Sequence, residues 1–191
     1  ATLYEAAGKT GDMSPMIRPI VPNSSLFGIA YTVKTFPSDS TAVIRALDLA
    51  PPASVLVIDA GGTNRAAVWG GTSSLVSSNR GLAGCVTNGS VRDTDDIIKT
   101  GLPVYAAGIS PRGTLKNHEG WLNIPVSVGD VPVFPGDFII ADSDGVVVIG
   151  KLDGYKICKN AKIQREKEIA RDNQVQNGEN LSSIIGLKTL E

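Results

Sequence analysis

The chain has 191 residues, of which 42% are hydrophobic, and a formal net charge of −1. This length and composition are typical of one soluble domain with its own core. The near-neutral charge gives no support for a nucleic-acid surface. No apolar run is long enough to cross a bilayer, and the start, ATLYEAAGKTGDM, lacks the regions of a signal peptide. We therefore expect a cytoplasmic protein that binds neither nucleic acid nor membrane.

Short runs rich in β-branched residues predict that sheet dominates the first part of the chain. The expected strands are 26–35, 54–58, 82–87, 103–107, 138–141 and 146–149. Helical patterns lie between them at 39–49 and 94–100, and a short helix is expected to open at Gly70-Gly71. In the first helix Asp39 or Ser40 can act as the cap, and the apolar face comprises Val43, Ala46, Leu47 and Ala50.

Tight turns shape the segment after residue 130. Pro135-Gly136 predicts a turn, and DSDG at Asp142 predicts a hairpin between two apolar strands. From about residue 154 the composition becomes charged and helix-forming. We therefore expect a single α/β domain over residues 1–191, with C-terminal helices that cover a sheet or a neighbouring subunit.

Three residues with reactive side chains have plain structural interpretations. Cys85 and Cys158 have no metal-ligand spacing, so both are expected to be reduced and structural. His118 is the single histidine and lies in a loop, where a surface position is the more common one.

The run from Gly70 to Asp96 combines a glycine pair, a basic residue and three carboxylates. Asp93 and Asp96 stand three residues apart at a predicted helix start, so their side chains can face the same way and hold a hard divalent cation. The alternative is a solvated acidic first turn, which the positive end of a helix also favours.

The neighbouring residues also allow two interpretations. Arg92 is either half of a structural ion pair or a guanidinium directed at a substrate carboxylate. Gly70-Gly71, followed by Thr72 and Ser73, either forms a simple turn or leaves backbone amides free to bind an anion. Neither a Walker motif nor a dinucleotide fingerprint is present.

Several motifs together resemble one family. They are DAGG at Asp59, WGG at Trp69, GLAGCVTNGSVRD ending at Asp93, and the later VFPGD and ADSDGVVVI. With these motifs the chain resembles the RraA-like proteins (regulator of ribonuclease activity A), which include the 4-hydroxy-4-methyl-2-oxoglutarate aldolases. Aldolase-like members in which twenty residues separate a glycine from an Arg-Asp pair carry a second acid three residues after that Asp. This chain matches with Gly71, Arg92-Asp93 and Asp96.

The resemblance implies a β/β/α sandwich of the swivelling type that assembles as trimers or pairs of trimers. It implies a lyase for small 2-oxo acids that depends on Mg²⁺ or Mn²⁺ and proceeds through a pyruvate enolate, with oxaloacetate decarboxylation as a second activity. Asp93 would anchor the metal and Asp96 support it. Arg92 and the backbone at Gly70, Gly71, Thr72 and Ser73 would bind the substrate, and Arg92 and Asp93 would be catalytic. An acid of a neighbouring subunit, from among Glu166, Glu168 and Glu179, would complete the site.

One departure and two alternatives remain. Many relatives have Asp-Gly where this chain has Asn88-Gly89, which removes a charge and affects the expected substrate preference. Some relatives are non-catalytic regulators that bind and inhibit a ribonuclease, but their acid motif is usually broken, whereas here it is intact. Methyl transfer to a quinone is disfavoured, because the chain has no glycine-rich strand-to-helix motif suited to a methyl donor.

Overall fold

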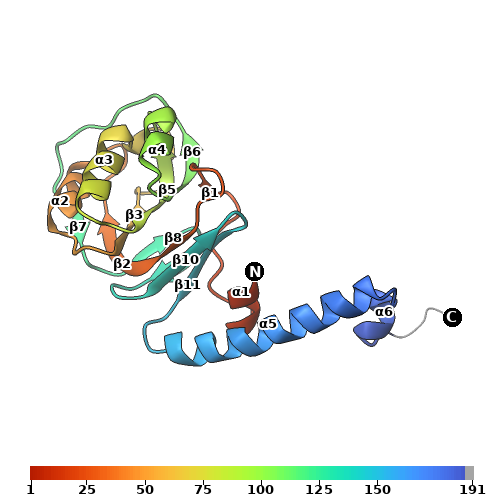
Figure 1. Cartoon of the computed structure of the whole chain (residues 1–191). Coiled ribbons are helices and arrows are strands. Elements are labelled where there is room, and N and C mark those ends of the chain that lie inside the picture. The colour runs from red at the N-terminus through yellow and green to blue at the C-terminus, as the bar shows by residue number, and fades with distance from the viewer. Residues whose placement is uncertain (188–191) are drawn as a thin grey trace. The chain divides into compact units, whose positions relative to one another are not determined.

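The computed structural model describes residues 1–187 and divides into two compact units. One unit comprises Gly11–Gly154, and the other comprises Ala1–Thr10 together with the chain from Tyr155 onward. Figure 1 shows the sheet and its helices in the first unit. All the candidate site residues between Gly70 and Asp96 belong to that unit.

A mixed sheet forms the centre of the first unit, with strand order β1-β6-β5-β3-β2-β10-β11. Strands β2, β3, β5 and β6 pair in parallel with one another, and β4 pairs in parallel with β5. The other pairs are antiparallel: β1 with β6, β7 and β10 with β2, and β11 with β10. The strands are β1 (Arg18–Pro19), β2 (Leu26–Lys34), β3 (Ser54–Asp59), β4 (Ala67–Trp69), β5 (Gly84–Val91), β6 (Val104–Ile109), β7 (Trp121–Leu122), β10 (Phe138–Asp142) and β11 (Gly145–Ile149).

Each face of this sheet has its own core. Every residue of β3 is buried, which is typical of a strand covered on both sides. Leu56 and Ile58 of β3 belong to the core under helices α2 (Thr41–Leu49), α3 (Gly71–Asn79) and α4 (Thr94–Thr100). Val55 and Val57 alternate with them and face the hairpin of β8 (Val126–Val128) and β9 (Val131–Val133). Hairpin, sheet and helices therefore form three layers (Figure 1).

One short segment bonds to both edges of the sheet. The Met13 amide donates to the Val146 carbonyl on β11, at 2.9 Å. A few residues later Arg18 pairs with Ala106 on β6, the strand next to the other edge. The sheet is therefore nearly closed, because residues 11–19 connect its two ends.

The predicted mixed α/β fold is confirmed, and the differences concern its edges. The two-residue hairpin after Asp142 is present, with Asp142 opposite Gly145. All four residues expected on the apolar face of α2 are buried. Strand β5 continues to Val91, four residues beyond its expected end, because β4 and β6 pair with that extension. The short strands β1, β4, β7, β8 and β9 were not predicted, since two or three residues carry too little periodicity.

The second unit is helical. It contains α1 (Thr2–Ala6), α5 (Gly154–Gln176, which begins at the last residue of the first unit) and α6 (Leu181–Ile184). Within it Thr2 Oγ1 donates to Glu168 Oε2 at 2.8 Å. No residue of α5, all of which the structure describes, is buried. The cover expected for a sheet or a neighbouring subunit stays a prediction.

The two cysteines differ in environment, and both are free thiols. Cys85 is buried in β5, and this burial raises the pKa of its thiol well above the ordinary value. Cys158 is exposed on α5, so the expected structural role does not hold for it. Between residues 1 and 187, no helix is both long enough and apolar enough to span a bilayer.

The loop between β6 and β7 is fastened to the start of α2 by a buried carboxylate. Asp39 is 1% exposed. Its Oδ1 accepts from the Thr41 amide at 2.8 Å, and its Oδ2 accepts from the amides of Asn117 and His118 at 2.7 and 3.2 Å. Burial raises the pKa of Asp39, but the hydrogen bonds, led by those from Thr41 and Asn117, lower it by more, so the net pKa lies below its usual value. Asp39 thus stabilises the loop in its ionised form.

Replacing this carboxylate is expected to destabilise the fold. Asp39→Asn places an amide group against backbone donors, so we expect the free energy of unfolding at neutral pH to fall by about 1–3 kcal/mol. Because the pKa of Asp39 is depressed in the folded state, its contribution is complete above the unfolded pKa of about 4 and is lost as pH falls through the folded value. Urea unfolding of both proteins between pH 7 and 3 should show the difference shrinking below about pH 4.

The matched control is Asp153→Asn, whose carboxylate is exposed. Its free energy of unfolding should stay within about 0.5 kcal/mol of that of the parent chain at every pH. An Asp39→Asn penalty that stayed constant down to pH 3 would contradict the role of the ionised carboxylate.

Candidate active site

The site begins where two parallel strands end side by side. Strand β4 pairs with β5, with Trp69 opposite Val91, and the Arg92 amide donates to the Trp69 carbonyl at 3.1 Å. Helices α3 and α4 then begin at the same edge of the sheet and pack against each other. This pairing brings Gly70 next to Arg92, although 21 residues separate them in the sequence.

Two glycines allow the helix starts to approach closely. A Cβ atom at Gly70 would lie 3.0 Å from Asp93 Oδ2. A Cβ atom at Gly71 would lie 2.8 Å from Asp96 Cβ, a contact that real Cβ atoms essentially never make. Packing between α3 and α4 therefore requires glycine at position 71, whereas a side chain at position 70 would shift the Asp93 carboxylate by a few tenths of an ångström. The glycine pair is thus more than a simple turn.

The N-terminus of α3 presents backbone donors. Its first amides, at Gly71, Thr72 and Ser73, have no partner within the helix, and Gly70 provides no side-chain cap. The Trp69 ring anchors this turn from below, because Trp69 Nε1 donates to Ser74 Oγ at 2.8 Å. Free amides at the positive end of a helix favour binding of an anionic group.

Asp93 occupies an unusual backbone conformation at the start of α4. Its φ and ψ angles of 55° and 45° lie in the left-handed region, which costs a non-glycine residue about 1–2 kcal/mol. Its carbonyl accepts from the amides of Asp96 and Ile97, both at 3.0 Å. The Arg92 and Asp93 side chains are each about half exposed, and Arg92 Nε lies 3.6 Å from Asp93 Oδ2. Both groups are therefore accessible to a ligand.

Asp96 lies against the same helix start but is engaged differently. Its Oδ1 accepts a hydrogen bond from Lys99 Nζ at 3.0 Å. Lys99 is fully exposed, and hydrogen bonding to Asp96 is the main cause that raises the pKa of its ammonium group. The Asp96 side chain is not among those that line the cavity described next.

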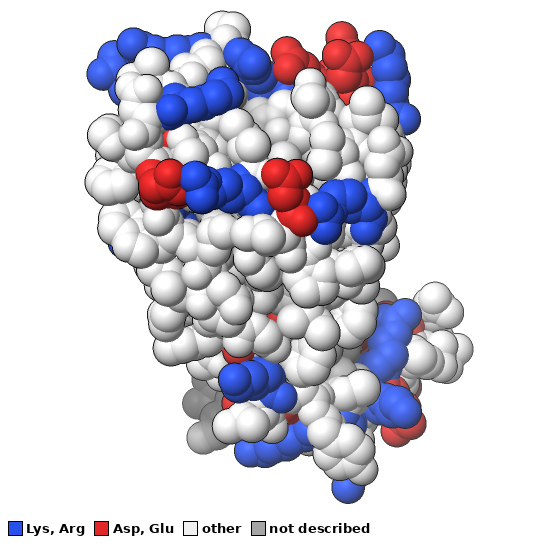
Figure 2. Space-filling view, turned by 90° about the vertical axis from the view of Figure 1, so that its left-hand side faces the viewer, with Lys and Arg blue, Asp and Glu red and all other residues white. Residues whose placement is uncertain are grey.

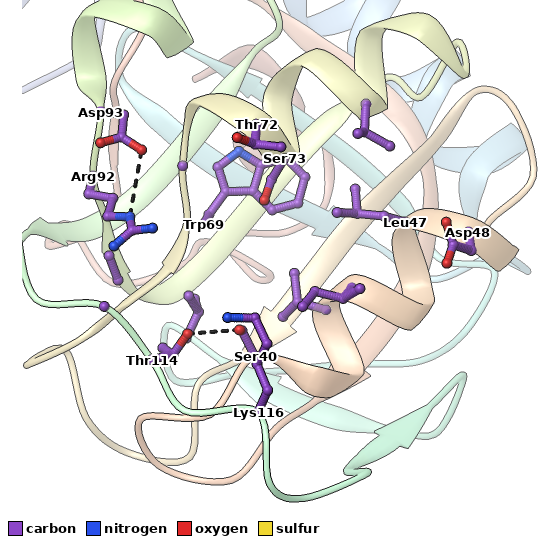
Figure 3. A pocket seen from close by; sticks show the side chains of 17 residues that line it. Ser40, Leu47, Asp48, Trp69, Thr72, Ser73, Arg92, Asp93, Thr114 and Lys116 are labelled. Atoms are coloured by element: carbon purple, nitrogen blue, oxygen red, sulfur yellow. Dashed lines mark hydrogen bonds and ion pairs between the residues drawn. The ribbon is translucent and has the colours of Figure 1, made fainter.

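A cavity of about 540 Å³ opens beside Arg92 and Asp93 (Figure 3). It lies between α2, the start of α3 and the β6–β7 loop. Five of the residues expected at the substrate or metal line it: Gly70, Thr72, Ser73, Arg92 and Asp93. Ser40, Trp69, Thr114 and Lys116 also line it and were not predicted as site residues.

The β6–β7 loop forms the wall opposite α3. A Cβ atom at Gly113 would lie 2.9 Å from Arg92 Nη1, so the loop backbone packs directly on the guanidinium. Thr114 Oγ1 donates to Ser40 Oγ at 2.7 Å, which connects this wall to the start of α2. Figure 3 shows Lys116 reaching into the cavity on the side opposite Trp69. Only the fold brings this loop to Arg92, because no local motif marks it.

Two other residues singled out in the sequence lie away from this cavity. His118 packs against Phe36, with ring centroids 4.8 Å apart, and does not line the cavity. Asn88 accepts from the Ala60 amide at 2.7 Å and donates to Asp59 Oδ1 at 3.3 Å. An aspartate at position 88 would repel Asp59. Having asparagine at this position therefore affects the contacts of the DAGG loop and not the cavity beside Arg92.

The carboxylates near Arg92 supply part of the ligand set that a hard cation needs. Between residues 1 and 187, no group of three or more His, Cys, Asp or Glu side chains is arranged to hold a metal ion. Asp93 and Asp96 provide carboxylate oxygens next to Gly70-Gly71: a Cβ atom at Gly70 would lie 3.0 Å from Asp93 Oδ2, and one at Gly71 would lie 3.4 Å from Asp96 Oδ2. Mg²⁺ commonly takes one or two carboxylates and completes its shell with water and substrate oxygens, so these residues fit such an ion.

The surface on the α2 and β7 side of the first unit has no dominant charge. Figure 2 shows acidic and basic side chains in alternating small clusters there, separated by uncharged surface. An extended basic face of the kind that binds nucleic acid is not seen in this view.

Solved structures share this fold. The chain superposes with a TM-score of 0.82 on an uncharacterized protein from Pseudomonas syringae, at 24% identity, covering 96% of this chain and 90% of that one. It superposes with a TM-score of 0.71 on the RNA-processing inhibitor RraA from Thermus thermophilis, at 27% identity, covering 77% and 89%.

A curated relative and a family model agree with this result. Over 164 residues the chain is 32% identical to a protein of Halalkalibacterium halodurans named "Putative 4-hydroxy-4-methyl-2-oxoglutarate aldolase", covering 86% of this chain and 78% of that one. The family described as RraA-like, Aldolase/RraA, matches residues 1–148. The chain therefore belongs to the RraA-like family.

Proposed function

We propose that the protein is a divalent-metal-dependent carbon–carbon lyase that releases pyruvate from 4-hydroxy-2-oxo acids. The proposal also includes decarboxylation of oxaloacetate, because both reactions form the enolate of pyruvate. One observation carries it: Arg92, Asp93 and the free amides of α3 meet at one end of a single cavity. The name of the curated relative points in the same direction.

Binding of the substrate follows from the donors present. The planar guanidinium of Arg92 can form two parallel hydrogen bonds to a carboxylate. The amides of Thr72 and Ser73 add donors to the 2-oxo acid end, where negative charge grows as the carbon–carbon bond breaks. Because these groups are held by the strand ends and by Gly113, they need little rearrangement during the reaction.

Asp93 and Asp96 are the residues that would hold the cation. A bound Mg²⁺ or Mn²⁺ would act as a Lewis acid toward the substrate oxygens. Asp93 faces the cavity and would be the direct ligand, and Asp96, paired with Lys99, would support the ion from outside the cavity. The proposal includes the homotrimer or hexamer implied by the family, which sedimentation of the purified protein would measure.

The first test is pyruvate release from oxaloacetate and from 4-hydroxy-4-methyl-2-oxoglutarate, followed with a coupled dehydrogenase assay. We expect turnover with added Mg²⁺ or Mn²⁺ and a fall to the protein-free rate with excess chelator, restored when the metal is returned. Absence of release from both substrates at saturating metal would contradict the lyase.

A second test removes the two central side chains. Arg92→Ala and Asp93→Ala should each lower kcat/KM by at least about a hundredfold, because each removes a group that acts on developing charge. Circular dichroism and thermal unfolding should remain close to those of the parent chain, since both side chains are half exposed. Arg65→Ala, at an exposed position outside the cavity, is the control and should keep the parent rate. Near-normal rates in either site variant would contradict the assignment.

The second candidate is a regulator that binds and inhibits a ribonuclease. The similarity to the RNA-processing inhibitor from Thermus favours it. Recovery of a ribonuclease by the immobilised protein, together with no metal-dependent turnover, would favour this function over the lyase.

A further inference from the structure

The cavity beside Arg92 has two chemically different ends. The end described above carries Arg92, Asp93 and the amides of α3. The opposite end is built from apolar side chains of α2 and α3, and Figure 3 shows Leu47 there, across Trp69 from Arg92. The cavity's apolar lining residues, which include three from β4, are Val43, Ile44, Leu47, Ala67, Val68, Trp69 and Val76.

The apolar end is a fixed part of the fold. Val43 and Leu47 are 1% and 6% exposed and belong to the core between the sheet and the helices. Val76 packs against the same core. Their side chains are therefore held in place before any ligand binds. Ile44 is 41% exposed and forms the outer part of this wall.

The size of the cavity exceeds the needs of pyruvate. A volume of about 540 Å³ lies in the range of pockets that enclose drug-sized ligands. When the 2-oxo acid end binds Arg92, the groups on C4 of the substrate extend toward α2. The wall that they meet is apolar, so it removes hydrocarbon from water but offers a charged group no compensation.

Charges near this end also disfavour a second carboxylate. Asp48 stands at the far rim, beyond Leu47 (Figure 3). Among the lining residues that the structure describes, Lys116 is the one cation besides Arg92, and it lies on the loop side with Thr114 and Ser40. A substrate carboxylate directed along α2 would approach Asp48 and lie away from Lys116.

We propose that the site selects 4-hydroxy-2-oxo acids whose C4 carries an uncharged, apolar substituent. This inference rests on the proposed lyase function. In the reaction the C3–C4 bond breaks and its electron pair stays on C3 as the enolate. The C4 hydroxyl loses its proton and becomes the carbonyl of an apolar aldehyde, and C3 gains a proton to give pyruvate.

The test is a homologous series with methyl, ethyl and propyl groups on C4, each as the 4-hydroxy-2-oxo acid, compared with 4-hydroxy-4-methyl-2-oxoglutarate and oxaloacetate. We expect kcat/KM to rise about fourfold with each added methylene, the gain for removing one CH₂ from water. The propyl compound should exceed the dicarboxylic aldol substrate. A flat series, or a higher kcat/KM for 4-hydroxy-4-methyl-2-oxoglutarate, would overturn the proposal.

Ile44→Asn tests the wall itself, and Ile98→Asn is the matched control. Both isoleucines lie on helices and are similarly exposed, at 41% and 43%, but Ile98 does not line the cavity. Ile44→Asn should lower kcat/KM for the propyl compound about tenfold, whereas Ile98→Asn should leave it at the parent value. Equal effects of the two variants on the propyl compound would exclude the wall as the cause.

A binding measurement separates this inference from the lyase function. Titration calorimetry with 2-oxobutanoate, 2-oxopentanoate and 2-oxohexanoate, which lack the C4 hydroxyl and are not cleaved, should give a Kd that falls about fourfold per methylene. That trend without any pyruvate release would support the apolar end and overturn the lyase. Oxaloacetate turnover with no trend in either series would support the lyase and overturn the selectivity.

Discussion

The close approach of two helix starts is the constraint on which the site depends. Strands β4 and β5 run parallel and end together, so the chain leaves both at one edge of the sheet. A side chain at position 71 would collide with Asp96, and one at position 70 would displace the Asp93 carboxylate, so the two glycines remove that obstacle. As a result the free amides of α3 and the charged pair at the start of α4 share one small volume. The left-handed conformation of Asp93 belongs to the same arrangement, because it turns the chain sharply from β5 into α4.

A second constraint positions the opposite wall. The β6–β7 loop has little regular structure, yet the buried carboxylate of Asp39 accepts two of its backbone amides. The bond between Thr114 and Ser40 adds a second connection to α2. Gly113 then lies directly on Arg92, so the loop limits the orientations of the guanidinium. The cavity thus has the starts of α3 and α4 on one side. On the other side it has the β6–β7 loop, which hydrogen bonds connect to the start of α2.

Membership of the RraA-like family leaves open whether a chain acts as an enzyme or as a regulator, because a fold can support both and only the site decides. Here the groups that lie together are the Arg92 guanidinium, the Asp93 carboxylate and the free backbone amides at the start of α3. This set suits an anionic substrate whose charge increases during reaction. The apolar surface of α2 next to it extends the same cavity, so recognition of the substrate tail and chemistry at its oxo acid end would use adjoining walls.

The sequence by itself determined the mixed α/β pattern, the three helices between strands and the cluster of Gly70, Gly71, Arg92 and Asp93. These features are local: β-branched runs, helical periodicity and a glycine pair express themselves within a few residues. Tertiary structure alone decided the rest. It lengthened β5 to Val91 through pairing with its neighbours and placed Asn88 at the DAGG loop. It also brought Lys116 and the α2 face to Arg92. These contacts join distant segments, so they depend on the order of the strands and on the loop that the buried carboxylate of Asp39 holds in place. No short sequence pattern encodes such contacts.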